Sequence, residues 1–261
     1  MADIIAFANH KGGVGKTTTV MNTAGVLGER GYKVLIVDLD PQASLSLGFG
    51  ANISELKFTI SEAMIDRRNY HIEDLIEQIR DNIFIVPTNL NLAASERELV
   101  RAMRGEDRLK HVLRRSDFVK EVCDFVLIDC PPALNILTLN ALTAAHGVVI
   151  PMESAFFPLV GVNLLLNTIE DVQFEVNPEL KILGILPTRH AANTNHANET
   201  LNTVKEALSH IPLFEARIRE AVKVKESPVD GKTISEYDPK HAVVQDYNQF
   251  VDELLQVTSH A

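Results

Sequence analysis

Short apolar runs alternate with longer amphipathic stretches along this chain of 261 residues. The short runs are rich in Val, Ile and Leu and lie at 4–8, 34–37, 83–86, 125–128, 148–151 and 182–186. Runs of this length and composition are typical of buried strands. The longer stretches repeat apolar positions at helical spacing and include 16–30, 91–104, 159–174 and 241–257. The alternation predicts an α/β fold, a mostly parallel twisted sheet with helices on both faces.

The composition fits one large core. Hydrophobic residues make up 46% of the chain, and no repeat, low-complexity tract or linker-like stretch divides it. A chain of this length can bury one sizeable core, so we expect a single domain over 1–261. No apolar stretch is long enough to span a membrane, and the first strand leaves no room for a signal peptide. We therefore expect a cytoplasmic protein.

Two cysteines, Cys123 and Cys130, lie on either side of the apolar run 125–128. In a cytosolic protein we expect them to be reduced packing residues. A cluster-binding reductase that shares an iron–sulfur cluster across a dimer needs two widely separated cysteines per chain, and these two are only seven residues apart.

A glycine-rich segment with two lysines, K-G-G-V-G-K-T-T over 11–18, follows the first apolar run and opens the first helical stretch. Glycines allow successive N–H groups to point inward at a phosphate, and the helix N-terminus adds the positive end of its dipole. Lys16 would contact the β- and γ-phosphates, and the Thr17 hydroxyl would bind Mg²⁺. His10 stands where the usual G-x-x-x-x-G-K-[ST] pattern has its first glycine. The order of strand, loop and helix indicates a loop that binds nucleoside triphosphates.

Acidic residues follow two further apolar runs, Asp38 and Asp40 after 34–37 and Asp129 after 125–128. Ligands bind α/β sheets at the carboxyl ends of the strands. We assign Asp129 to the magnesium shell, and Asp40 to the attacking water and the outer shell of the metal. Asp38 either serves the second shell of the metal or fixes the loop, and both interpretations stay open.

Three motifs together resemble the ParA/Soj-type P-loop ATPases of the ParA/MinD group, whose phosphate-binding loop has a deviant form. They are K-G-G-x-G-K-T-[ST] over 11–18, D-x-D-P-Q over 38–42 and D-x-P-P over 129–132. Weaker similarity covers most of the chain, including the strand 184–188 and a Y-D-P turn at 237–239.

The resemblance implies an ATPase that uses ATP and Mg²⁺ and forms a homodimer on ATP binding. In the family the first lysine of the loop, here Lys11, crosses the dimer interface to the nucleotide of the partner, so the expected catalytic residues are Lys11, Lys16 and Asp40. The strand 184–188 would approach the base, and Pro228 would line the adenine pocket or be an ordinary turn proline. The nucleotide-binding residues expected are Lys11, Gly12, Gly13, Val14, Gly15, Lys16, Thr17, Thr18, Thr188 and Pro228. The metal-binding residues expected are Thr17, Asp40 and Asp129.

Two segments depart from the family pattern. The family usually has T-x-x-x-x-R-T after the strand 184–188, whereas this chain has T-R-H-A-A-N-T-N over 188–195. The family segment R-L-S-E-A-P-S is replaced by the sequence over 219–228. In the family both segments bear on base contact and DNA binding, so these two differences affect what the resemblance implies about those contacts.

The implied function is partition of a plasmid or chromosome, with binding to DNA of any sequence in the ATP state, a ParB-like activator protein and association with the nucleoid. The formal net charge of −10 opposes binding to phosphate, so a local basic patch is needed. One candidate set lies near the C-terminus and is interleaved with acidic residues: Arg217, Arg219 and Lys223, with Lys225 and Lys232. The other consists of Arg97, Arg101, Arg104 and Arg108, whose spacing would align four guanidinium groups along one helix face. An ordinary solvated surface is a third interpretation of either set.

The alternative function is a MinD-like or other cargo-positioning ATPase that acts on a membrane or a protein assembly. A membrane-binding helix needs a basic polar face. The last stretch, 241–257, has an apolar stripe but no Lys or Arg, and Asp246, Asp252 and Glu253 would repel anionic lipid. We expect this helix to pack onto its own domain and expect no stable membrane anchor.

Overall fold

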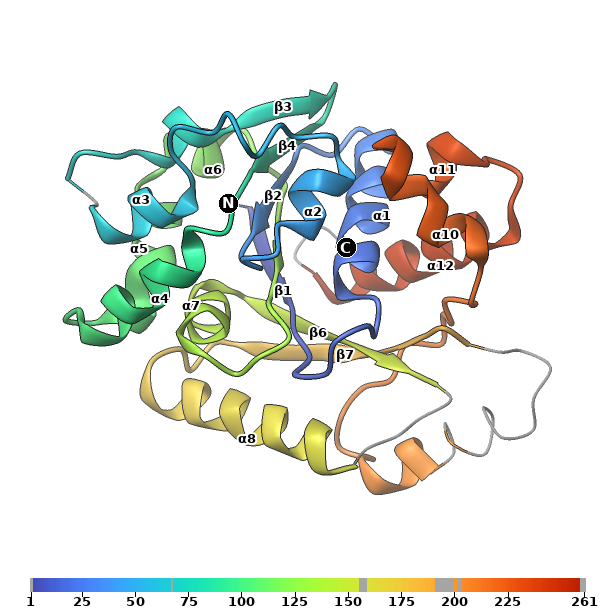
Figure 1. The fold of residues 1–261 in the computed structure, drawn as a ribbon. Coiled ribbons are helices and arrows are strands. Elements are labelled where there is room, and N and C mark those ends of the chain that lie inside the picture. Colours follow the sequence, from blue (N-terminus) through green and yellow to red (C-terminus); the bar gives the residue numbers. More distant parts are fainter. Residues whose placement is uncertain (1, 67, 155–158, 191–199, 201–202, 259–261) are drawn as a thin grey trace.

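A seven-stranded sheet forms the centre of the computed structural model, which describes residues 2–66, 68–154, 159–190, 200 and 203–258 (Figure 1). The strands are β1 (Asp3–Phe7), β2 (Val34–Asp38), β3 (Glu77–Arg80), β4 (Ile83–Val86), β5 (Phe125–Asp129), β6 (Gly147–Glu153) and β7 (Lys181–Thr188). Their order in the sheet is β3-β4-β2-β5-β1-β6-β7, and every neighbouring pair is parallel except β3 with β4. The predicted mostly parallel sheet is confirmed, and each of the six predicted strands is present within two residues at either end.

The helices cover both faces of the sheet. The α-helices whose bounds follow are α1 (Lys16–Glu29), α2 (Ser44–Gly48), α3 (Ile60–Ile65), α4 (Leu92–Arg101), α5 (Arg108–Arg115), α6 (Asp117–Glu121), α7 (Ile136–Ala144), α8 (Leu159–Glu175), α10 (Val222–Glu226), α11 (Ile234–Tyr237) and α12 (Ala242–Val257). Short 3-10 helices lie at η1 (Ile72–Leu75), η2 (Gly105–Asp107) and η3 (Ser227–Asp230). Figure 1 shows α1 and α12 on one side of the sheet and α4, α5 and α7 on the other.

Side chains that alternate between the two faces of each strand form two hydrophobic clusters, one on each face of the sheet. In β1, Ile5 and Phe7 pack in a cluster with α1 and α12, whereas Ile4 and Ala6 pack in the cluster that includes α4, α5, α7 and α8. Successive side chains of a strand point to opposite faces, so a strand that is apolar at every position must be covered on both. This is why the buried strands read as continuous apolar runs.

The last helix packs onto its own chain, as expected. The apolar stripe of α12 is buried against the domain: Val243, Tyr247, Phe250, Val251 and Leu254. Glu253 on the same helix accepts hydrogen bonds from the backbone N–H groups of Glu215 and Ala216. Across the described ranges, none of the helices has the length and apolar character needed to cross a bilayer.

The helix predicted over 91–104 is shorter in the structure, and the prediction of four arginines on one helix face is wrong. Helix α4 ends at Arg101, the next residue is extended, and Arg104 has a left-handed φ of 54°. At Gly105 a Cβ atom would lie 1.8 Å from the carbonyl oxygen of Leu99, so the chain turns where only glycine fits. Arg108 therefore begins a different helix, α5.

Both cysteines are buried and have free thiols, in agreement with their expected packing role. Burial raises the pKa of the Cys123 thiol to about 12, and burial together with the charge of Asp129 raises the pKa of Cys130 further. Neither thiol is therefore ionised near neutral pH.

Candidate nucleotide-binding site

The register of the central strands brings the predicted acidic residues beside the glycine-rich loop. Strand β5 lies between β1 and β2, where Asp129 is opposite Phe7 on one side and Asp38 on the other. The loop leaves β1 at this edge and enters α1 directly. Within the loop, Gly13 and Gly15 have φ values of 77° and 86°. These values favour glycine, which explains two of the glycines in the motif.

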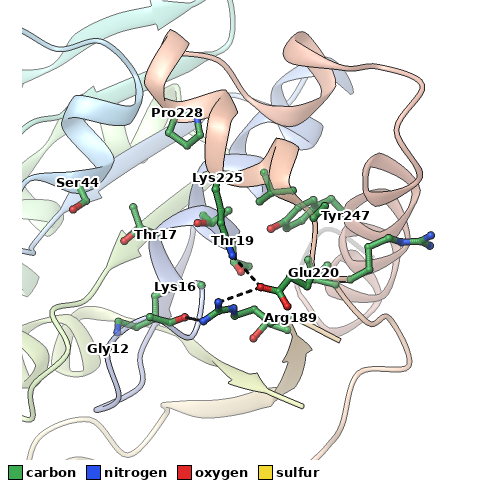
Figure 2. A pocket seen from close by; sticks show the side chains of 18 of the residues that line it. Gly12, Lys16, Thr17, Thr19, Ser44, Arg189, Glu220, Lys225, Pro228 and Tyr247 are labelled. Carbon is green, nitrogen blue, oxygen red and sulfur yellow. Dashed lines mark hydrogen bonds and ion pairs between the residues drawn. The ribbon is translucent and has the colours of Figure 1, made fainter. Parts of the chain in front are cut away.

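A pocket of about 460 Å³ opens over the loop (Figure 2). From the expected nucleotide-binding set, its lining includes Gly12, Gly13, Gly15, Lys16, Thr17, Thr18, Thr188 and Pro228. Asp40 also lines the pocket. Segment 218–228 and Tyr247 form the wall opposite the loop. The size of the pocket is typical of sites for small ligands and cofactors.

Lys16 is buried at the base of this pocket, with 7% of its surface exposed. Its ammonium group donates a hydrogen bond to the carbonyl oxygen of Lys11, 3.2 Å away. Burial lowers the pKa of Lys16, although the charges of Asp129 and Asp40 partly oppose this effect. An ammonium group held away from water is stabilised by an anion placed beside it.

Asp129 is fully buried, and among the described residues neither of its carboxylate oxygens accepts a hydrogen bond of good geometry, although the Thr17 hydroxyl lies close enough to partly hold its pKa down. Burial and the nearby charge of Asp38 raise the pKa of Asp129 well above its usual range. A buried carboxylate with no well-formed hydrogen bond fits a cation site, because a metal ion supplies positive charge to oxygens that water cannot reach.

These residues fit magnesium. Mg²⁺ prefers oxygen ligands and commonly binds through one or two carboxylates, water and substrate phosphates. Thr17, Asp40 and Asp129 supply one hydroxyl and two carboxylates to the same end of the sheet. When bound there, the ion would neutralise phosphate oxygens. Within the described part of the chain, no three His, Cys, Asp or Glu residues form a metal cage of their own, so the phosphates would have to complete the coordination.

Asp38 connects β2 to α2. Its carboxylate accepts hydrogen bonds from the backbone N–H and the hydroxyl of Ser46 at 2.9 and 2.7 Å, and from the backbone N–H of Asp40 at 3.1 Å. Burial raises the pKa of Asp38 to about 6. These contacts support the loop-fixing interpretation of Asp38. They also orient the backbone of Asp40, whose own carboxylate accepts from the N–H of Gln42.

Two residues of the expected nucleotide-binding set do not line the pocket. The ammonium group of Lys11 points instead to Glu153 at the end of β6, 3.0 Å from a carboxylate oxygen. Val14 is buried, and its carbonyl oxygen accepts a hydrogen bond of 2.8 Å from the hydroxyl of Thr188. Thr188 therefore connects the end of β7 to the loop.

The C-terminal basic set is largely paired with acidic residues. Arg219 forms two side-chain hydrogen bonds of 2.7 Å with Asp246, and its backbone N–H donates to the same carboxylate. Lys223 lies 3.4 Å from Glu226. Arg217 is half-buried. Arg219 also lines the pocket, so its charge belongs to the nucleotide site as much as to the surface.

The other basic set is divided between two helices. Arg101 is exposed at the end of α4. Arg104 pairs with Asp107 at 2.8 Å, and Arg108 donates a hydrogen bond to the carbonyl oxygen of Met103. These arginines remain close in sequence but do not form a single aligned row.

Sequence reasoning missed several residues of the pocket wall, above all Arg189, Glu220 and Lys225. Arg189 directly follows Thr188, and this adjacency was the available signal. Glu220 and Arg189 are 31 residues apart along the chain, and no local pattern indicates that they meet.

A mostly parallel sheet, a glycine-rich loop leading into a helix, a buried lysine and a buried strand-end aspartate together define a P-loop nucleoside triphosphatase. A family profile described as "AAA domain" matches residues 2–182. The sporulation initiation inhibitor protein Soj of Bacillus subtilis is 36% identical over 97% of this chain and 98% of its own. The chromosome partitioning protein ParA of Myxococcus xanthus is also 36% identical, and the match covers 97% of this chain and 87% of that protein. The chain belongs to the ParA/Soj family of P-loop ATPases, so the expected family and enzyme class are confirmed.

Solved structures agree with the fold. A solved structure of cobyrinic acid a,c-diamide synthase from Mycobacterium smegmatis, with bound ADP and magnesium, has a TM-score of 0.85 to this chain. The two sequences are 34% identical, and the match covers 98% of this chain and 95% of that chain. The septum site-determining protein MinD of Pyrococcus horikoshii, complexed with Mg-ADP, has a TM-score of 0.75 at 24% identity. This match covers 97% of this chain and 96% of that chain. The second likeness concerns the fold alone.

Proposed function

We propose that this chain is a switch ATPase that binds ATP with Mg²⁺, dimerises in the ATP state and acts in partition of plasmid or chromosomal DNA. The main support is the pocket, in which the glycine-rich loop meets buried Lys16 and Asp40, in a chain of the ParA/Soj family. Asp129 does not line the pocket, but it is buried at the end of β5, close enough for its charge to act on Lys16. The loop N–H groups and Lys16 neutralise phosphate oxygens, and Asp40 orients the attacking water. Thr17, Asp40 and Asp129 are the residues that would hold the metal, which would supply positive charge to the phosphate oxygens.

Dimerisation is assigned to Lys11, whose equivalent in the family crosses to the nucleotide of the partner. In the single chain the Lys11 ammonium pairs with Glu153, and its side chain is 32% exposed. A pair this accessible is weakly held, so Lys11 can exchange its partner at small cost.

The oligomeric state tests this proposal. In an Asp40→Ala background that slows turnover, light scattering should give a dimer with ATP and a monomer with ADP. Lys11→Ala should bind ATP and stay monomeric, whereas the control Lys120→Ala, which removes a surface lysine from α6, should still dimerise. A dimer that forms without nucleotide and without Lys11 would contradict the proposal.

We further propose that the ATP dimer binds DNA of any sequence, associates with the nucleoid in the cytoplasm and responds to a ParB-like activator. Because the chain has a net charge of −10, binding requires basic patches that dimerisation brings together. The pairing of Arg219 with Asp246 makes Arg219 unsuitable as a probe, since its removal would leave a buried carboxylate unpaired. The sets to compare are Arg217 with Lys223, and Arg101 with Arg104.

Fluorescence anisotropy with two unrelated duplexes measures this binding. We expect equal affinity for both duplexes, only with ATP, and a steep loss as salt rises. Alanine at the pair that contacts DNA should weaken binding to both duplexes equally. If the wild-type ATP dimer ignores DNA at low salt, positioning of a protein assembly becomes the better function. The buried apolar stripe of α12 argues against a membrane as the cargo surface.

A further inference from the structure

Arg189 extends from the end of β7 across the phosphate-binding loop. Its guanidinium donates a hydrogen bond of 3.2 Å to the carbonyl oxygen of Gly13, and Figure 2 shows the side chain lying along the floor of the pocket near Lys16. The backbone of Arg189 has a φ of 48°, a left-handed conformation that disfavours non-glycine residues. Strain of this kind at a pocket is a reason to look for a functional role.

The Glu220 carboxylate forms ion pairs with both Arg189 and Lys225. One of its carboxylate oxygens lies 3.2 Å from Arg189 and 2.9 Å from the ammonium group of Lys225 on α10 (Figure 2). Lys225 and Arg189 hold the pKa of the Glu220 carboxyl below its usual range. All three side chains line the pocket.

The same arginine is 3.9 Å from Glu153, the partner of Lys11. Positive and negative groups therefore alternate from the loop to α10 in the order Lys11, Glu153, Arg189, Glu220, Lys225. The three cations exceed the two carboxylates by one charge. This row lies against a loop whose inward N–H groups and helix dipole also favour an anion.

We propose that Arg189 is a nucleotide-binding residue whose guanidinium contacts a phosphate group of the bound nucleotide, and that Glu220 is the intramolecular anion that the phosphate replaces. Arginine suits this exchange because its planar donors bind carboxylate and phosphate in the same geometry. Both partners are partly exposed, 35% for Arg189 and 48% for Glu220, so breaking their ion pair costs little. The Glu220 carboxylate thus lowers the affinity for nucleotide by competing for Arg189 and Lys225.

Competition binding with a fluorescent ADP analogue tests the proposal, using ATP, ADP, inorganic triphosphate and adenosine as competitors. Arg189→Gln should weaken ATP, ADP and triphosphate by about tenfold, the effect of one charge-assisted hydrogen bond, and leave adenosine unchanged. Arg189→Lys should restore part of the loss. Arg30→Gln, which removes an arginine paired with Asp252 at the far end of α1, is the matched control and should change nothing.

The carboxylate is tested in the opposite direction. Glu220→Gln should tighten triphosphate binding about threefold or more, and the gain should shrink when Arg189→Gln is added, because one of the two cations it frees is then absent. Glu226→Gln makes the same charge change on α10 outside the pocket lining and should have a smaller effect.

Unchanged triphosphate affinity in Arg189→Gln, or an equal loss for adenosine, would overturn the assignment while the ATPase proposal stands. A wild-type chain that binds neither ATP nor ADP would overturn both.

Discussion

Removing the charge of Lys16 tests the chemistry of the pocket most directly. Lys16→Met replaces the side chain by an uncharged apolar one of similar length and so removes the ammonium group, which donates a hydrogen bond to the carbonyl oxygen of Lys11. If the ammonium contacts two phosphate groups, two charge-assisted hydrogen bonds of about 1.5–3 kcal/mol each are lost. The sum, about 3–6 kcal/mol, corresponds to a weakening of about 10²–10⁴-fold in ATP affinity.

Thermal unfolding separates this loss from misfolding. Burial lowers the pKa of Lys16, which means that the fold disfavours its charged form. Lys16→Met should therefore melt at the same temperature as wild type or higher in the absence of nucleotide, while calorimetry shows the loss of ATP binding. Lys33→Met is the control, because Lys33 contacts Asn82 at the opposite end of β2. Equal ATP affinity in Lys16→Met and wild type would refute the assignment.

Three further outcomes are expected. Asp40→Ala should bind ATP with an affinity within about threefold of wild type but release phosphate at least about 10²-fold more slowly, because the carboxylate orients the attacking water and does not contact the nucleotide. A normal rate of phosphate release would contradict this role. Affinity for ADP with Mg²⁺ should fall as the pH drops through about 6, the pKa to which burial raises Asp38, because protonation of Asp38 weakens the hydrogen bonds that hold the loop carrying Asp40. Burial also raises the pKa of Asp129, so its protonation acts in the same direction. Binding measured without Mg²⁺ should lack this decline. Phe250→Ala should lower the free energy of unfolding in urea by about 3–5 kcal/mol, because the Phe250 ring is fully buried and packs edge-to-face on Phe214, with 5.0 Å between the ring centroids. A loss below about 1 kcal/mol would show that neighbouring side chains fill the space.

The strands could be predicted because their physical requirement is local. Each parallel strand is covered on both faces, so nearly every residue is apolar and the run is visible without tertiary information. The loop was equally visible, since the left-handed φ values of Gly13 and Gly15 restrict those positions to glycine. The strand-end aspartates followed from the rule that ligands meet the carboxyl ends of strands.

The missed features depend on contacts between distant segments. Strand β3 has the sequence E-Q-I-R and lies at the edge of the sheet, where β4 is its one neighbour among the described strands, so it needs no apolar pattern. The break after Arg101 depends on the close approach of Gly105 to the preceding helix turn, which helical spacing of arginines cannot reveal. Which charges are neutralised is also a tertiary property: Arg219 meets Asp246 across 27 residues.

The electrostatics of the pocket connect nucleotide binding to folding. Lys16 and Asp129 are both held away from water, so burial disfavours their charged forms even though each charge partly compensates the other. A phosphate beside Lys16 and a cation beside Asp129 would each add the countercharge that this partial compensation leaves short. Ligands that bind only the folded state stabilise it in proportion to their affinity. Lys16 and Asp129 therefore lower the stability of the nucleotide-free fold and raise its affinity for the ligand. A variant that neutralises either residue should unfold at a higher temperature without nucleotide, and added nucleotide should raise that temperature less than it does in wild type.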